Sequence, residues 1–368
     1  MSRMLLAPSR YVQGPGATNE IGEHAARLGS KALITGGKTA LSACGGAISN
    51  SLSEKQLGSH QEVFNGECCD SEIQRLVEAA RTQGCDLVIA AGGGKVIDTG
   101  KAVAHEMKVP VVIVPTIAAT DAPCSALSVV YSESGVFDRY LVLPKNPECV
   151  LVDTQIVAQA PVEYLVSGMG DALATFWEAD TCAKSCKPNV LTSGCPPTLS
   201  SITLARLCYD TLLQHGLAAK LTVETQSVTP SVEAIVEANT LLSGLGFESG
   251  GLAGAHSVHN GFTVLEQSHH TLHGQKVAFG TLTQLIMEGR PRDDILEVLD
   301  FCLTVGLPVC LEDMGVHSPT REDIRTVAEA TTAMGETIHA TWFSVNANMV
   351  ESAIWAADAI GRQYKSMC

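Results

Sequence analysis

The sequence predicts an α/β domain with a parallel sheet over residues 1–160 and an all-helical domain over residues 161–368. Three observations support this prediction. Short aliphatic runs alternate with helical stretches in the first part of the chain. Beyond Pro161 the spacing of apolar residues becomes helical and β-branched runs almost disappear. The length is enough for two domains of ordinary size.

Four aliphatic runs in the first domain have the length of strands. They are bounded by glycine, proline or polar residues, and each is apolar almost throughout. Strands buried on both faces have this pattern, which is typical of a parallel sheet covered by helices. The predicted strands are Lys31–Thr35, Asp86–Ala91, Val109–Val114 and Glu148–Asp153.

The second domain shows apolar residues three and four positions apart over long stretches, the spacing of amphipathic helices. We expect glycine and proline to interrupt these helices at Gly216, at Gly244–Gly254 and at Pro308. The predicted helices are Ser201–Gln214, Ser231–Ser243, Lys276–Glu288, Asp293–Val305, Arg321–Met334 and Asn348–Tyr364.

Composition excludes some classes of function. The formal net charge is −15, which argues against a nucleic-acid partner. No apolar run reaches the roughly 18 residues of a membrane span, and the N-terminus does not resemble a signal peptide. The thirteen cysteines are therefore expected to be reduced thiols in a cytoplasmic protein. A structural zinc site at Cys182, Cys186 and Cys195 is the alternative that their clustering leaves open.

A glycine-rich segment, Gly92-Gly93-Gly94-Lys95, follows the second predicted strand and precedes a helical stretch at Val96–Glu106. Glycines let a backbone approach a pyrophosphate, and the positive end of the following helix attracts it. The segment therefore predicts a dinucleotide loop that includes Gly93 and Gly94. A turn of purely structural role is the alternative.

A polar loop, Pro115–Asp121, follows the third predicted strand. Open α/β sheets bind ligands at the carboxyl ends of their strands, so Asp121 is a candidate to accept hydrogen bonds from a substrate or a ribose. Capping of the next helical segment is an equally open role for this side chain.

The second domain carries a possible metal site. Five of the eleven histidines lie between residues 256 and 273, and Asp171 stands in a glycine- and alanine-rich segment. Two histidines and a carboxylate suit a divalent cation and leave a coordination position open. Spacing alone does not say which histidines bind. A polar helix face, and for Asp171 an acid at a helix start, remain the structural alternatives.

Taken together, these segments resemble the iron-containing, or group III, alcohol dehydrogenase superfamily, and within it the glycerol dehydrogenase branch. The resemblance covers nearly the whole chain, and five blocks in the same order make it specific. The blocks are 92–98, 115–128, 170–175, 247–253 and 273–280.

The resemblance implies the fold of dehydroquinate synthase and its relatives, and it assigns roles to individual residues. Asp171, His256 and His273 would hold a zinc ion, and Asp121 would contact substrate. The implied NAD contacts are Gly94, Lys95, Asp98, Thr116, Ser125, Leu127 and Tyr131.

Two positions depart from relatives. Iron-using members carry a histidine four residues after the aspartate, where this chain has Thr175, which favours zinc with three protein ligands. Glycerol dehydrogenases usually carry an acid after the first strand to hold the adenosine ribose, where this chain has Gly37 followed by Lys38. We therefore expect weaker discrimination of NAD against NADP.

The resulting hypothesis is zinc-dependent oxidation of glycerol to dihydroxyacetone, with hydride transfer to NAD. A cyclase of the dehydroquinate synthase type and a glycerol-1-phosphate dehydrogenase are the alternatives. Both handle a phosphate and should need several basic residues near the metal, where the sequence supplies only Lys276. The resemblance also implies a homo-oligomer, with an octamer as one form.

Overall fold

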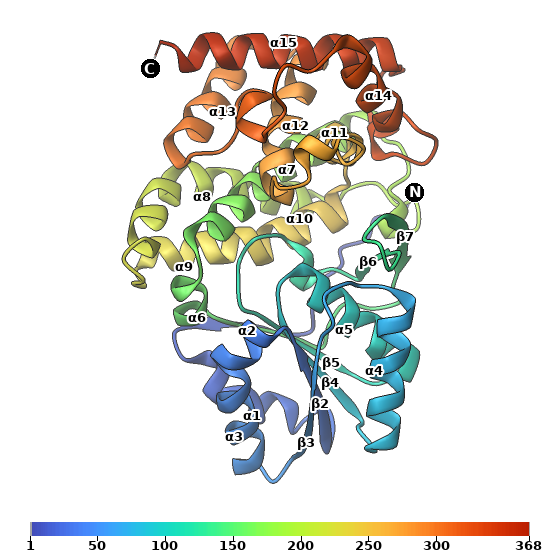
Figure 1. Cartoon of the computed structure of the whole chain (residues 1–368), viewed down its shortest axis with the longest axis vertical. Coiled ribbons are helices and arrows are strands. Elements are labelled where there is room, and N and C mark those ends of the chain that lie inside the picture. The colour runs from blue at the N-terminus through green and yellow to red at the C-terminus, as the bar shows by residue number, and fades with distance from the viewer. Residues whose placement is uncertain (1, 368) are drawn as a thin grey trace. The chain divides into compact units, whose positions relative to one another are not determined.

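The computed structural model describes residues 2–367, including all their side chains except those of Phe137 and Val190. Within these residues every strand lies between residues 11 and 153, and the rest of the regular structure is helical. The predicted change from an α/β to an all-helical architecture is therefore confirmed (Figure 1). No helix in the described part is long and apolar enough to cross a membrane.

Six parallel strands form the main sheet, in the order β1-β8-β5-β4-β2-β3. The four predicted strands correspond to β2, β4, β5 and β8, and they occupy its centre. The prediction missed the two edge strands and the antiparallel hairpin β6–β7. The strands are β1 (Tyr11–Gly14), β2 (Lys31–Gly36), β3 (Gly58–Val63), β4 (Leu87–Gly92), β5 (Val111–Pro115), β6 (Leu127–Tyr131), β7 (Phe137–Val142) and β8 (Cys149–Asp153).

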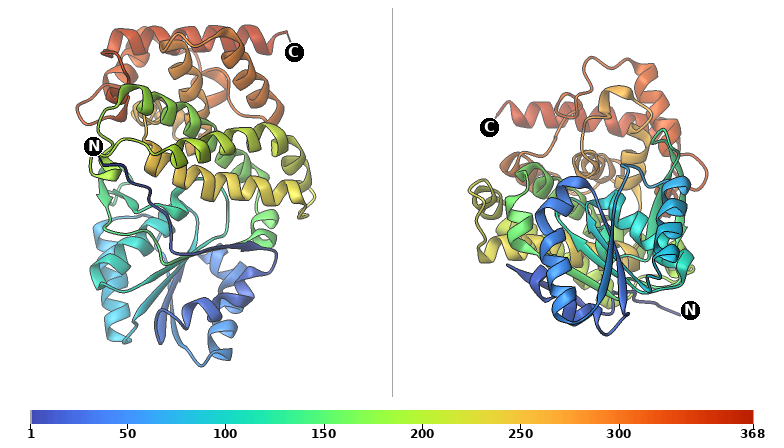
Figure 2. Two further views of the ribbon diagram at one scale, coloured as in Figure 1. Left: turned by 180° about the vertical axis from the view of Figure 1, so that it is seen from behind. Right: turned by 60° about the horizontal axis from the view of Figure 1, so that its bottom comes forward.

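Helices cover both faces of this sheet, as the second view in Figure 2 shows. On one face, alternate residues of the central strands form a core with α1 and α3. On the other face α5 lies so close to β4 that a Cβ at Gly100 would be 2.2 Å from the Cβ of Ala90. The helices of this part are α1 (Ile21–Ala25), α2 (Lys38–Ala40), α3 (Gly46–Glu54), α4 (Asp70–Thr82), α5 (Gly94–Met107) and α6 (Thr154–Gln159).

The remaining helices follow the sheet in sequence. Each predicted helix is present; α10 and α11 were not predicted, and α7 extends well beyond the helix start that one alternative placed at Asp171. They are α7 (Val162–Ser185), α8 (Leu199–Val223), α9 (Pro230–Glu237), α10 (Ser243–Gly250), α11 (Gly254–Phe262), α12 (His273–Met287), α13 (Arg292–Val305), α14 (Arg321–Thr331) and α15 (Ala347–Lys365).

The break expected at Gly216 is absent, and the one expected at Gly244–Gly254 is confined to residues 251–253, because glycines serve close packing inside α8 and α10. Gly216 lies inside α8, where a Cβ would be 2.8 Å from the Phe301 ring. Gly246 lies inside α10, where a Cβ would be 2.5 Å from the Thr175 methyl group. A glycine at such a contact lets two helices approach more closely than any other residue would allow.

The chain forms two compact units, and it passes between them more than once. The sheet unit comprises Leu6–Leu165 and Leu221–Gly244, and the helical unit comprises Met1–Leu5, Val166–Lys220 and Leu245–Cys368. The chain leaves the sheet unit after Leu165, five residues beyond the boundary expected at residue 160. The sequence reasoning did not anticipate that residues 221–244 belong with the sheet.

Within the sheet unit, hydrogen bonds connect residues 221–244 to strand β1 and to the first residue of α6. The Tyr11 hydroxyl meets Thr240 Oγ1 at 2.6 Å, and the Gln13 amide donates to Glu233 Oε2 at 2.6 Å. Thr154 Oγ1 donates to Glu233 Oε1 at 2.6 Å. All twelve cysteines that the structure describes are free thiols, in agreement with the expected reduced state.

Candidate active site

Asp171 lies in the middle of α7, so it is not the helix-start acid that one alternative proposed. Its neighbour Gly170 and the second residue of α12, Gly274, bring the two helix backbones into contact. A Cβ on Gly274 would be 1.7 Å from the Ser167 carbonyl oxygen, and one on Gly170 would be 2.3 Å from the Gly274 oxygen. This contact sets His273 Nε2 3.0 Å from Asp171 Oδ1.

His256 reaches the same carboxylate from α11. Helices α11 and α12 meet at another glycine, since a Cβ on Gly280 would be 2.3 Å from the Ala255 oxygen. His256 Nε2 then lies 3.2 Å from Asp171 Oδ1. One ligand atom from each of Asp171, His256 and His273 falls within 4.8 Å of the others, and among the described residues this is the only such group.

The three donors fit a divalent cation. Two imidazole nitrogens and one carboxylate oxygen this close together are the donor set of zinc sites that leave a position open for substrate. Cys182, Cys186 and Cys195 do not come together in this way, so the alternative zinc site at these cysteines is not supported by the described residues.

Burial and charge shape the ionisation of this group. Burial alone would raise the pKa of Asp171, but the His273 and His256 imidazoles outweigh it and hold that pKa below its usual range. Burial alone would lower the pKa of His256, but the carboxylates of Glu178 and Asp171 outweigh the effect of burial and raise that pKa. A fully buried carboxylate between two imidazoles is thus kept as the anion that a cation requires.

Of the other histidines in the cluster, one is part of the site's surroundings. His259 Nε2 lies 3.1 Å from His273 Nδ1, on the side of the ring away from Asp171. Burial, with the nearby His273 and Lys276, places the pKa of His259 well below its usual range. His269 and His270 are exposed, and neither joins the group.

The sequence reasoning missed Glu178 and Gln284. Glu178 Oε2 lies 2.6 Å from His256 Nδ1; the Glu178 side chain is fully buried in α7, and that of His256 is 13% exposed. Glu178 stands seven residues after Asp171, two helical turns further along the same face of α7. That spacing of two acids in an apolar segment is the signal that could have identified it.

The predicted dinucleotide loop connects β4 to α5. Gly93 is the N-cap residue of α5 in an extended conformation, and a Cβ there would be 2.9 Å from the Ile117 side chain. Gly93 and Gly94 carry no side chains, and the first N–H groups of the fourteen-residue helix α5 lie at this loop. Both features suit the pyrophosphate of a dinucleotide.

The expected NAD contacts surround that loop. Lys95 is half exposed and pairs with Glu67, its Nζ 2.6 Å from Oε2, and it also faces the Tyr131 ring at 5.7 Å. Thr116 donates its N–H to the Gly92 oxygen. Ser125 and Leu127 follow in the next loop and in β6, where both are buried.

Asp98 performs a structural task that the sequence did not reveal. Its Oδ1 lies 3.0 Å from Lys101 Nζ, and its Oδ2 accepts the Val129 N–H at 3.0 Å. Lys101 Nζ also donates to the Leu127 carbonyl oxygen. This buried pair therefore ties α5 to β6, and a direct contact of Asp98 with a nucleotide stays a prediction.

Asp121 is buried and makes no capping hydrogen bond to the short helical turn that follows it. Its Oδ2 instead accepts a hydrogen bond from Ser243 Oγ at 2.8 Å. Gly37 is the N-cap residue of α2, and no atom lies within 4 Å of the position that a Cβ would take. Neighbouring Lys38 is exposed.

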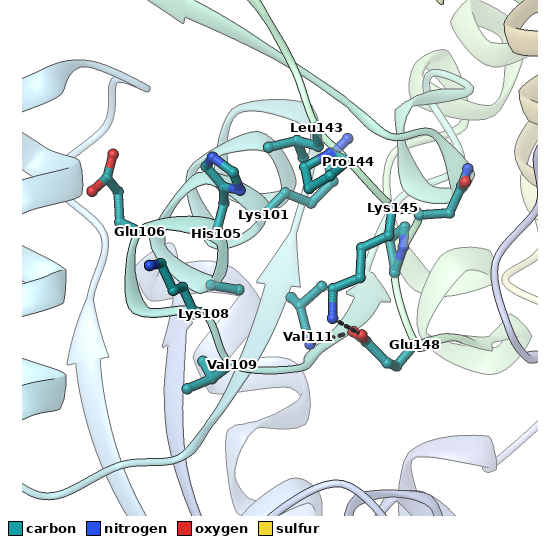
Figure 3. A pocket seen from close by; sticks show the side chains of 13 residues that line it. Lys101, His105, Glu106, Lys108, Val109, Val111, Leu143, Pro144, Lys145 and Glu148 are labelled. Carbon is teal, nitrogen blue, oxygen red and sulfur yellow. Dashed lines mark hydrogen bonds and ion pairs between the residues drawn. The ribbon is translucent and has the colours of Figure 1, made fainter. Parts of the chain in front are cut away.

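A separate cavity of about 440 Å³ lies at the amino-terminal ends of strands β5 and β8, away from the dinucleotide loop (Figure 3). It is bounded by the end of α5, the start of β5 and the segment before β8, and Lys145 pairs with Glu148 on its wall. Ligands of open α/β sheets bind where the strands end, and this cavity lies where β5 and β8 begin. It is therefore not the candidate active site.

Comparison with known proteins adds independent information. Residues 8–154 match the family model "Iron-containing alcohol dehydrogenase". The chain is 48% identical to the glycerol dehydrogenase of Citrobacter freundii over 364 residues, which cover 99% of each chain. It is 47% identical to the glycolaldehyde reductase of Halobacterium salinarum over 365 residues, 99% of this chain and all of that protein.

Among solved structures, the glycerol dehydrogenase of Schizosaccharomyces pombe superposes with a TM-score of 0.96 at 35% identity. The match covers all of this chain and 93% of the other. The fold described above is thus the fold of that protein, sheet and helical parts included.

Proposed function

Because the chain belongs to the family of iron-containing alcohol dehydrogenases, we propose that it oxidises glycerol to dihydroxyacetone with NAD. One glycerol and one NAD⁺ give one dihydroxyacetone, one NADH and one proton. The observation that carries the proposal is the group formed by Asp171, His256 and His273. Its three donors suit a zinc ion, while relatives 46–50% identical over nearly the full chain are glycerol dehydrogenases.

The chain's own residues fix the place where an alcohol can react. Asp171 supplies one negative charge, and His256 and His273 supply neutral nitrogens, so a bound dication keeps a net positive charge of about one. When bound, zinc supplies Lewis acidity toward a hydroxyl oxygen, which favours loss of the hydroxyl proton near neutral pH. The contact between α7 and α12 at Gly274 fixes the donors before substrate arrives.

We assign the binding of NAD to the loop at Gly93 and Gly94 with Lys95 beside it. The loop offers backbone N–H groups and the positive end of α5 to the pyrophosphate. NAD itself supplies the hydride acceptor. Asp121, whose carboxylate is oriented by Ser243, is proposed to accept a hydrogen bond from a substrate hydroxyl.

The two alternatives that use phosphorylated substrates are not favoured. They need basic side chains near the metal, and Lys276 is directed elsewhere: its Nζ lies 3.5 Å from the Ser268 oxygen, and burial lowers its pKa. A lysine with a lowered pKa is a weaker anchor for a phosphate. Oligomerisation and a cytoplasmic location stay predictions.

Removal and return of the metal tests the proposal. Dialysis against a strong chelator should abolish glycerol oxidation, and added zinc should restore it. His273→Ala should bind no zinc and show no turnover, while exposed His270 offers a matched control, since His270→Ala should keep both. Full activity in a demonstrably metal-free sample would refute the proposed mechanism.

A substrate panel separates glycerol from its neighbours. Glycerol, 1,2-propanediol and 2,3-butanediol all present a secondary alcohol beside another oxygen, and the reduction of glycolaldehyde is the activity named for the Halobacterium relative. Initial rates with both NAD and NADP should give the highest kcat/KM for glycerol with NAD. A preference for glycolaldehyde and NADH would reassign the substrate and leave the chemistry unchanged.

A further inference from the structure

Helix α11 begins without a side-chain acceptor at its N-cap position. The first N–H groups of a helix have no partner within the helix and are normally satisfied by a side chain at the N-cap position. The N-cap residue of α11 is Ala253, which offers no acceptor. The segment Ala253–Ala255 is buried, so these N–H groups are shielded from water.

Two side chains from other helices solve this problem. Gln284 of α12 accepts from the N–H groups of Gly254 and Ala255 on one oxygen, at 2.9 and 2.8 Å. Glu178 of α7 accepts from the N–H groups of Ala253 and His256 on Oε1, at 2.9 and 3.0 Å. Four N–H groups are thereby satisfied by two residues distant in the sequence.

Glu178 differs from Gln284 in one respect. Its second oxygen, Oε2, lies 2.6 Å from His256 Nδ1, so one carboxylate holds both the backbone and the ring of the same residue. Such a bond from the far nitrogen fixes the orientation of a ligand histidine and places its proton on Nδ1. Nε2, which lies 3.2 Å from Asp171 Oδ1, is then the nitrogen left to bind a cation.

We propose that Glu178 is a positioning residue of the metal site, which sets the tautomer and the direction of His256 through this shared carboxylate. The inference rests on the proposed function, because it assumes that the cation binds at Nε2. It adds a residue that acts on the cation only through His256, and it explains why a completely buried acid stands in α7.

The geometry requires a carboxylate at position 178. Three N–H donors converge on two oxygens, and a carboxylate accepts at both. A glutamine offers one oxygen and one NH₂ group. If that oxygen keeps the two backbone bonds, the NH₂ group forces Nδ1 to accept and moves the ring proton to Nε2, where it opposes the cation. If the oxygen turns to Nδ1, the NH₂ group faces two backbone N–H groups and the cap is lost.

A purely structural role is the rival explanation, and Gln284 provides its control. Gln284→Met removes two caps from the same helix, and the hydrogen bonds of the Gln284 amide nitrogen to Thr181 and Glu288, without touching His256. It should lower the melting temperature of the metal-free protein yet leave the zinc dissociation constant within about threefold. Glu178→Gln should weaken zinc binding about 10- to 100-fold, the usual effect of losing such a partner. The fall in melting temperature caused by Glu178→Gln should not exceed the fall caused by Gln284→Met.

The measurement is competition for zinc between the full-length metal-free protein and a chromophoric chelator, with melting curves of the same samples. If Glu178→Gln does not fold, Glu178→Asp serves instead, because its shorter side chain cannot reach the backbone and the ring together; it too should bind zinc at least tenfold more weakly. Equal zinc affinity in the position-178 variant and the wild type, or an equal loss in Gln284→Met, would overturn the inference. A wild type that binds no zinc would overturn the proposed function as well, which distinguishes the two failures.

Discussion

Replacing Gly274 by alanine tests how the metal site is built. The added methyl group would lie 1.7 Å from the Ser167 carbonyl oxygen and 2.8 Å from the Asp171 nitrogen. Ordinary contacts begin at 3.4 Å, and both neighbours belong to the backbone of α7 and cannot rotate away. Helices α7 and α12 must therefore separate locally by roughly 1.7 Å, the difference between 3.4 Å and 1.7 Å.

The size of the effect follows from that displacement. Overpacking of a buried position costs typically about 1–3 kcal/mol, and a contact with fixed backbone belongs at the upper end. For a unit of this size, about 3 kcal/mol corresponds to a fall in Tm of roughly 6–12 °C. Zinc–ligand distances tolerate only about 0.2 Å, so moving His273 away from Asp171 should also weaken zinc binding more than tenfold.

The assay combines thermal unfolding of the metal-free variant with a zinc titration. Gly46→Ala is the matched control, because Gly46 begins a helix with no atom within 4 Å of its Cβ position. That change should leave zinc binding intact and stabilise slightly, by up to about 1 kcal/mol. A Gly274→Ala protein with the Tm and the zinc affinity of the wild type would show that the two helices do not hold the ligands at a fixed distance.

Two further predictions concern cofactor and substrate. Gly37→Asp should tighten NAD by about 1–2 kcal/mol, through hydrogen bonds to the ribose, and should disfavour NADP, since the added side chain meets no neighbouring atom. Comparison of kcat/KM for both cofactors checks it, and a wild type already more than about a thousandfold selective for NAD would contradict it. Asp121→Asn should lower kcat/KM for glycerol while the Kd of NADH stays within about threefold, under about 0.7 kcal/mol. Strongly weakened NADH binding with unchanged glycerol kinetics would show that Asp121 serves the cofactor.

The central part of the sheet could be predicted because burial on both faces leaves a continuous apolar run. The run Leu87–Gly92 is fully buried and carries this pattern plainly. Edge strand β3 could not be found in this way, since Gly58–Val63 lies at the edge of the sheet, is mostly polar and has no buried residue. Helix breaks were expected at Gly216 and around Gly246, yet both glycines lie inside helices. Composition does not distinguish a break in a helix from a close contact between two helices.

A cluster of histidines and one acid indicated a metal site, because ligand types are rare and chemically distinctive, but only the resemblance named the three candidate ligands. Their supporting residues could not be predicted in this way. Glu178 and Gln284 are common residue types, and their roles depend on distances between α7, α11 and α12 that no local pattern contains. Lys101 was missed for the same reason, since a lysine in a helix is normally solvated whereas this one is buried against Asp98.

The path of the chain between the two units limits which segments this protein can exchange with its relatives by recombination. A chimaera joined once near residue 160 would pair one parent's sheet with the other parent's segment 221–244. The hydrogen bonds of Tyr11, Gln13 and Thr154 with Glu233 and Thr240 would then join residues from two different parents. Recombination that keeps the sheet unit intact needs two more junctions, at residues 220 and 244. Adaptation of cofactor and substrate preference is therefore expected to proceed by single substitutions more readily than by shuffling whole units.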